Sequence, residues 1–169
     1  MPCSNVADVW VKVNAPVRYD WTGTYNDAVP VCPQPHPTDV CAKYAHPGTV
    51  FPYEDCRIFQ DESRGNHSAD AVPYLANVVA GFDPRPWHEA ACSFAPPTAA
   101  QWETALAMAK LQVEMPGSRM GFPDASQPDG VLPAFNIYAF NEYGEGGILA
   151  PTQGDGYMKL ETVAKVMGR

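Results

Sequence analysis

Two apolar segments on either side of an amphipathic helix constrain the fold of this chain more than any other feature. Residues 74–80 (YLANVVA) are almost continuously apolar, as expected for a strand that is covered on both faces. Residues 134–140 (AFNIYAF) form a second such segment. Between them, Thr98 and Gln101 form a capping-box pattern ahead of an apolar face, which predicts a helix. Strand, helix and strand in this order predict parallel pairing with a right-handed crossover.

The same alternation extends along the chain and defines the predicted fold class. Residues 5–13 fit the end of a helix, residues 17–26 a strand and residues 53–64 a short helix, and residues 30–52 form a long proline-rich loop. We expect a last helix with Asp155 as N-cap and an apolar stripe formed by Leu160, Val163, Ala164 and Met167. The prediction is an α/β fold with about three parallel strands and flanking helices.

Composition excludes several classes of protein. Hydrophobic residues make up 46% of the 169 residues and charged residues 18%, which is typical of a globular chain. The net charge of −8 argues against a nucleic-acid partner. No apolar segment approaches the roughly 20 residues of a membrane helix, and the N-terminal residues do not resemble a signal peptide.

The five cysteines leave two interpretations open. Cys32 and Cys41 bracket a stiff proline-rich loop that a disulfide would close, and this use of cysteine favours an exported protein. His36 and His46 lie nearby, so a zinc site is an alternative, although the spacing matches no common zinc pattern. We therefore expect no metal and no other cofactor.

Two carboxylates follow the last predicted strand. Glu142 and Glu145 lie in the segment AFNEYGEGG, in a loop loosened by glycine, where a turn brings both side chains to one cleft. A pair of carboxylates is the minimum equipment for hydrolysis of a glycosidic bond. The alternative is a pair of solvated loop acids, and the spacing of the two glutamates taken alone favours this alternative.

Aromatic residues gather at the same ends of the predicted strands. They are Trp21, Tyr25, Phe82, Trp87 and Tyr143. Aromatic rings stack on the C–H faces of sugars, although each of these rings taken singly is also compatible with core packing. Their clustering favours a glycan as the ligand.

Four segments resemble, in order, the last strands of the endo-α-mannosidase-like glycoside hydrolases, families 99 and 71 and their relatives. They are DWTGTYN (20–26), FPYEDC (51–56), VPYLANVVAGFDPRPW (72–87) and YAFNEYGEGGILAPT (138–152). The family fold is a (β/α)8 barrel, and the resemblance covers about residues 18 to 167, the last three strands. A complete barrel needs about 250 residues, so residues 1–169 are expected to form a single partial domain.

The resemblance implies roles for individual residues. The residue that matches Glu142 is the base that acts on the sugar 2-hydroxyl group, and the one that matches Glu145 is the general acid and then the base. Asn141, Tyr25, Trp87 and Tyr143 are implied contacts to the oligo- or polysaccharide.

Asp83 and Arg85 follow a strand end, where they either bind sugar hydroxyl groups or form a structural ion pair, with the ion pair slightly favoured. The family's mannosidase branch has Trp-His between the two acids where this chain has Tyr-Gly, so the resemblance does not specify the sugar.

Two other interpretations remain open from the sequence. One is a carbohydrate-binding or barrel-derived protein without turnover. The other is a fragment that is inactive alone, because three strands of a barrel leave unpaired sheet edges and uncovered apolar surface. Self-association or pairing with a missing barrel half is the partner expected in that case.

Overall fold

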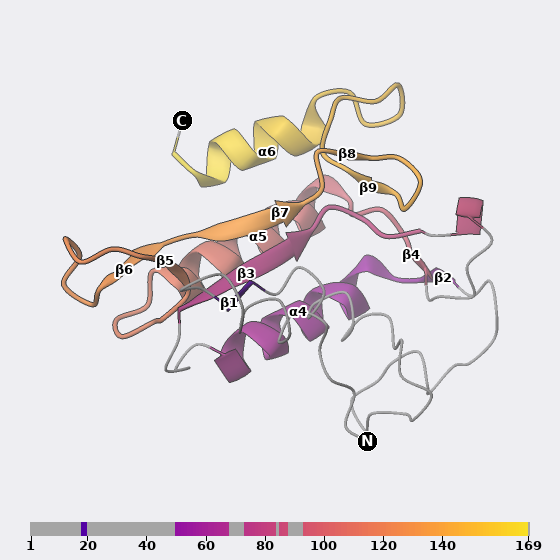
Figure 1. Ribbon diagram of the computed structural model, residues 1–169. Coiled ribbons are helices and arrows are strands. Elements are labelled where there is room, and N and C mark those ends of the chain that lie inside the picture. Colours follow the sequence, from indigo (N-terminus) through magenta and orange to yellow (C-terminus); the bar gives the residue numbers. More distant parts are fainter. Residues whose placement is uncertain (1–17, 20–49, 68–72, 84, 88–92, 169) are drawn as a thin grey trace, which may run out of the picture.

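A parallel three-stranded sheet forms the centre of the structure (Figure 1). The structure is a computed structural model that describes residues 18–19, 50–67, 73–83, 85–87 and 93–168. The sheet has the order β1 (Arg18–Tyr19), β3 (Tyr74–Val79), β7 (Phe135–Tyr138), and both pairings are parallel. The predicted adjacency of the two apolar strands is therefore confirmed. Every residue of β3 is buried, as its continuous apolar character requires.

Three helices pack beside this sheet. α5 (Ala99–Val113) contacts both α4 (Tyr53–His67) and α6 (Met158–Val166), and also contacts β3 and β7. The predicted capping box of α5 is present. The Gln101 backbone N–H donates to Thr98 Oγ1 at 3.3 Å, and the Thr98 backbone N–H donates to Gln101 Oε1 at 3.0 Å.

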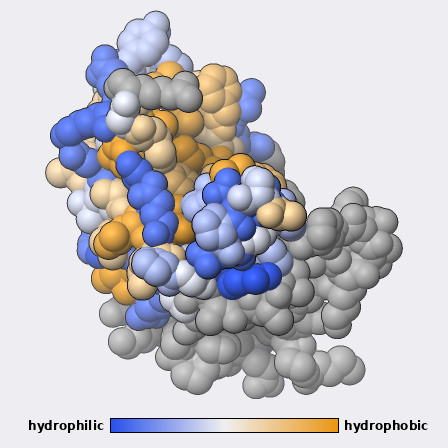
Figure 2. All heavy atoms as spheres, turned by 90° about the vertical axis from the view of Figure 1, so that its left-hand side faces the viewer, coloured by the Kyte–Doolittle hydropathy of each residue, from blue (hydrophilic) through white to orange (hydrophobic). Residues whose placement is uncertain are grey.

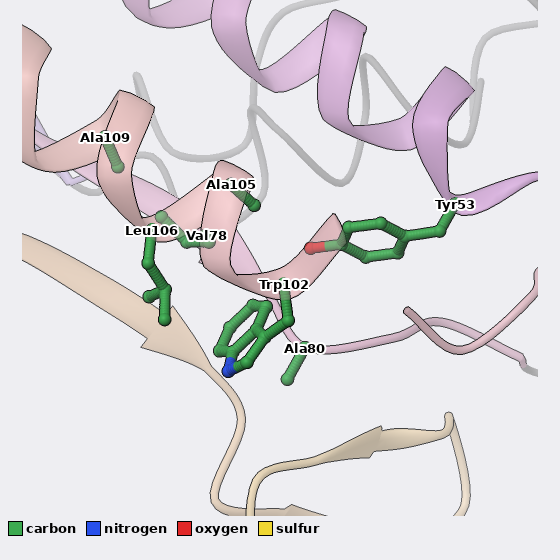
Figure 3. Close-up of a cluster of buried hydrophobic side chains, with 7 residues drawn as sticks. All are labelled: Tyr53, Val78, Ala80, Trp102, Ala105, Leu106 and Ala109. Carbon is green, nitrogen blue, oxygen red and sulfur yellow. The ribbon is translucent and has the colours of Figure 1, made fainter. Parts of the chain in front are cut away.

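The main apolar cluster lies between β3, α4 and α5 (Figure 3). Val78 and Ala80 point from the strand towards α5, which contributes the buried Trp102, Ala105 and Leu106. These α5 residues lie on one face because helical residues three and four apart are neighbours. Partly buried residues of β7 and α6 complete the cluster. This core fixes the direction in which both central strands end.

Side chains of α4 occupy the edge of β3 that faces β1. Within the described part of the chain, β1 pairs with β3 at Tyr74 and Leu75. Further along the strand, Arg64 Nη1 donates to Asn77 O at 3.1 Å, Gln60 Oε1 accepts from Val79 N at 3.0 Å, and Tyr53 Oη donates to Val79 O at 2.8 Å. Because buried backbone groups must be paired, these side chains take the place of strand partners.

Several short elements lie where the sequence predicted loops. β2 (Val50–Phe51), within the predicted proline-rich loop, pairs in parallel with β4 (Ser93–Phe94). β5 (Gly121–Pro123) and β6 (Val131–Pro133) form an antiparallel hairpin. Its cross-strand pair Phe122 and Leu132 is 47% and 45% exposed. The hairpin lies at the left of Figure 1, and the molecule seen from that side has apolar and polar surface interleaved (Figure 2). Strands of two or three residues are too short to produce a readable period of two.

The predicted N-cap of the last helix is wrong by two residues, since the observed N-cap is Tyr157 and not Asp155. α6 begins at Met158, and Asp155 instead lies in the turn before it, where Thr152 and Gly156 form a bridge. Gly156, at φ +55°, holds this turn in the left-handed region that a helix cannot enter. The apolar stripe is also displaced. Ala164 and Met167 are exposed, and Lys159 and Thr162 are buried.

The architecture is mixed α/β, with short parallel and antiparallel sheets. No closed barrel is present among the described residues. Most of the predicted strand 17–26, the predicted N-terminal helix and nearly all of the proline-rich loop lie outside the described part of the chain.

Candidate functional site

The segment that carries the two glutamates is a β-hairpin and not the flexible loop that the sequence predicted. β8 (Asn141–Glu142) pairs antiparallel with β9 (Gly147–Ile148). The hairpin is tied to the end of β7, because Ala139 O and Phe140 O accept hydrogen bonds from the chain that leaves β9. Glu142 therefore lies in a strand, whereas Glu145 lies in the turn. The glycines allow a tight return of the chain, with Gly146 at φ +71°.

The turn of this hairpin lies against the segment that follows β3. The Asp83 backbone N–H donates to Glu145 O at 2.5 Å. A Cβ atom on Gly81 would lie 2.7 Å from Gly146 O, and one on Gly146 would lie 3.1 Å from Asp83 N. A side chain at Gly81 would push the two backbones apart, and the position of Gly146 favours glycine because of its positive φ as well as the close approach of Asp83. The backbones of Glu145 and Asp83 are therefore in contact at one end of the sheet.

Glu145 is also held through its side chain. The Tyr138 hydroxyl group donates a hydrogen bond to Glu145 Oε2. Tyr138 is the last residue of β7, and it packs beside a buried cluster that includes Val79, Phe82 and Phe94. The strand end, the buried cluster and the hairpin turn together determine where this carboxylate lies.

Asp83 forms an ion pair with Arg85, the interpretation that the sequence slightly favoured. Arg85 Nε and Nη2 donate to the Asp83 carboxylate, each at 2.7 Å, and Ser93 Oγ donates to it at 3.1 Å. The hydrogen bonds from Arg85 are the largest reason that the pKa of Asp83 is lowered to about 2, and Ser93 adds to the shift. Asp83 is therefore ionised over the whole physiological pH range.

This pair predicts an acid-dependent loss of stability. Because the folded pKa is lowered from 3.8 to about 2, the contribution of Asp83 is complete above pH 4 and is lost as the pH falls towards 2. We expect Asp83→Asn to lower the free energy of unfolding at pH 7 by about 1 kcal/mol, since solvent screens a partly exposed pair. The difference between variant and wild type should disappear near pH 2. Urea unfolding at several pH values measures it.

Asp129→Asn is the matched control, since it removes an equal charge from an exposed position in the turn between β5 and β6. If Asp83→Asn and Asp129→Asn change the pH dependence of unfolding equally, the ion pair contributes nothing specific.

The remaining predicted site residues differ in their exposure and in their place in the fold. Asn141 and Tyr143 are exposed on it, and Glu142 is half-buried. Among the described residues, none donates a hydrogen bond to the Glu142 carboxylate. Trp87 is the last residue of the short 3-10 helix η1 (Arg85–Trp87). Tyr25 lies outside the described residues.

Sequence reasoning missed three residues that hold the site. Tyr138 lies in a segment that we assigned only as a strand. Its hydroxyl group and the amide of Asn136, two residues earlier and therefore on the same face of the strand, were the available signal. Ser93 had no signal. Lys159, with 5% of its surface exposed, donates from Nζ to Ile148 O at 2.7 Å and so ties α6 to β9. Burial lowers the pKa of this amine.

The residues of the candidate zinc site and disulfide lie outside the described part of the chain. No group of three histidine, cysteine or acidic side chains suited to a metal ion occurs in the described ranges. Cys56 is a buried free thiol, and burial raises its pKa to about 12. The predicted disulfide between Cys32 and Cys41 lies outside those ranges. No helix in the described part of the chain is both long and apolar enough to cross a membrane.

Comparisons with protein-family models, with curated proteins and with solved structures found no match to this chain.

Proposed function

We propose that this chain is the C-terminal part of a retaining glycoside hydrolase barrel that acts on an oligo- or polysaccharide. The observation that carries the proposal is the contact between two strand ends. Two adjacent parallel strands, β3 and β7, end on the same side, and the Glu145 turn is hydrogen-bonded to Asp83 there. Ligands of parallel α/β sheets bind at the carboxyl ends of the strands.

In the proposed reaction, Glu142 takes the proton of the sugar 2-hydroxyl group. The 2-oxygen of the sugar attacks the anomeric carbon at the same time and closes a three-membered ring. Glu145 gives a proton to the departing glycosidic oxygen, so that the bond breaks without a free alkoxide. Glu145 then takes a proton from water, which opens the three-membered ring at the anomeric carbon, and protonated Glu142 returns its proton to the 2-oxygen. The two inversions give net retention.

The surroundings of the two glutamates suit this division of roles. Glu145 is fixed by the Tyr138 hydroxyl group and by its own carbonyl oxygen, as expected of an acid that must meet one oxygen atom. Glu142 is half-buried, and it lies beside the exposed rings of Phe140 and Tyr143 on the same segment. Exposed rings next to carboxylates are suited to stacking on sugar faces.

We further propose that activity requires the missing N-terminal half of the barrel. Among the described residues, the largest parallel sheet has three strands, whereas a closed barrel requires about eight. The odd-numbered residues of β7, Phe135 and Ile137, point their backbone groups away from β3, where no strand among the described residues pairs with them. An additional strand from the missing half would satisfy these groups.

A glycan array and a hydrolysis assay, run together on this chain and on a longer version that includes upstream sequence, test the proposal. Hydrolysis by the longer protein with a retained anomeric configuration, followed by NMR, is the expected result. Glycan binding without turnover by either protein would instead support the non-catalytic alternative. The absence of both binding and turnover in the longer protein would refute the glycan assignment.

A further inference from the structure

We propose that Tyr138 is a positioning residue that selects which oxygen of Glu145 exchanges a proton with the substrate. The inference rests on the proposed function, because it concerns how the carboxylate that we propose as general acid is positioned. Tyr138 itself does not contact the reacting atoms. It acts through the hydrogen bond that its hydroxyl group donates to Glu145 Oε2.

The ring of Tyr138 is held from two sides. On one side it packs against the buried cluster that contains Val79 and Phe82. On the other side lies β9, where a Cβ atom on Gly147 would stand only 3.0 Å from Tyr138 Cε1. Glycine at this position lets the hairpin backbone lie directly against the ring. A ring confined in this way directs its hydroxyl group to one place.

The hydrogen bond makes the two oxygens of Glu145 unequal. Oε2 accepts from Tyr138, so Oε1 is the oxygen left to give a proton to a glycosidic oxygen and later to take one from water. The Asp83 backbone N–H holds the Glu145 carbonyl oxygen as well, so the residue is fixed at both its backbone and its carboxylate. A group fixed at both points meets the substrate with little loss of freedom in the transition state.

Tyr138→Phe is the test variant, because it removes one oxygen atom and keeps the packed ring. Tyr157→Phe is the matched control, since Tyr157 is 64% exposed and lies outside the site. Activity is measured on the longer protein with aryl glycosides and a glycosyl fluoride of the sugar that the wild type hydrolyses. We expect Tyr138→Phe to lower kcat by about 10- to 100-fold on a poor aryl leaving group, with KM nearly unchanged.

The dependence on the leaving group separates positioning from general damage. Fluoride departs with little help from an acid, so the loss in Tyr138→Phe should shrink to less than about threefold on the glycosyl fluoride. A variant that is merely misfolded would lose activity on both substrates equally. Equal losses on the two substrates, or no loss on either, overturn the proposal.

A second measurement needs no turnover. In protein labelled with 13C at glutamate carboxyl groups, the Glu145 signal is assigned by its disappearance in Glu145→Gln. We expect Tyr138→Phe to move this signal and to leave the Glu142 signal in place. An unmoved Glu145 signal overturns the proposal even if the protein proves inactive. Full activity of Glu145→Gln would instead refute the proposed function, so the two failures are distinguishable.

Discussion

Glu142→Gln and Glu145→Gln should each lower glycan hydrolysis by the longer protein by about 10²- to 10⁴-fold. Glutamine keeps the shape of the side chain but neither gives nor takes a proton at neutral pH. Glu142→Gln should lose activity on every substrate, because in the proposed reaction the 2-hydroxyl group loses its proton whatever the leaving group. Glu145→Gln should keep more activity on a glycosyl fluoride than on a natural glycan. Initial rates on both substrates measure these differences.

Glu62→Gln is the matched control for both variants. Glu62 is an exposed acid on α4, and its replacement should leave the rate within about twofold of the wild type. Circular dichroism and thermal unfolding establish that all three variants fold. Wild-type activity in folded Glu142→Gln or folded Glu145→Gln would exclude that residue from the mechanism.

Trp102→Ala should lower the free energy of unfolding by about 3–5 kcal/mol. Trp102 has no exposed surface, and it fills the space between β3 and α5 (Figure 3). Its indole Nε1 also donates to Lys159 O at 3.1 Å, which ties α5 to the start of α6. Since Lys159 holds β9 in turn, the substitution should also loosen the hairpin that carries the glutamates. Urea unfolding measures the stability, and hydrogen exchange of the hairpin amides measures the loosening.

Leu111→Ala, on an exposed position of the same helix, is the control and should cost less than about 1 kcal/mol. Trp102→Phe keeps most of the buried ring and removes the N–H donor, so it should cost an intermediate amount. A loss below about 1 kcal/mol for Trp102→Ala would mean that this cluster does not hold the helices to the sheet.

The backbone contact between Asp83 and Glu145 agrees with the parallel pairing that the sequence predicted for the two strands. Both residues come after apolar strands, and parallel strands end at the same edge of a sheet, so no side-chain detail was needed. The hairpin geometry of Glu142 was not predictable in this way. Its strands have two residues each, and their pairing depends on bonds to Ala139, Phe140 and Lys159.

The sequence by itself determined the elements that have long periodic patterns: β3, β7 and α5 with its capping box at Thr98. Periodicity and caps are local, so neighbouring residues specify them. Only the tertiary structure decided which face of α6 is buried and which side chains hold Glu145. Tyr138 meets that carboxylate because β9 packs against its ring, and the buried Lys159 donates a hydrogen bond to Ile148 O. Contacts of this kind join separate elements of the fold, and no local pattern encodes them.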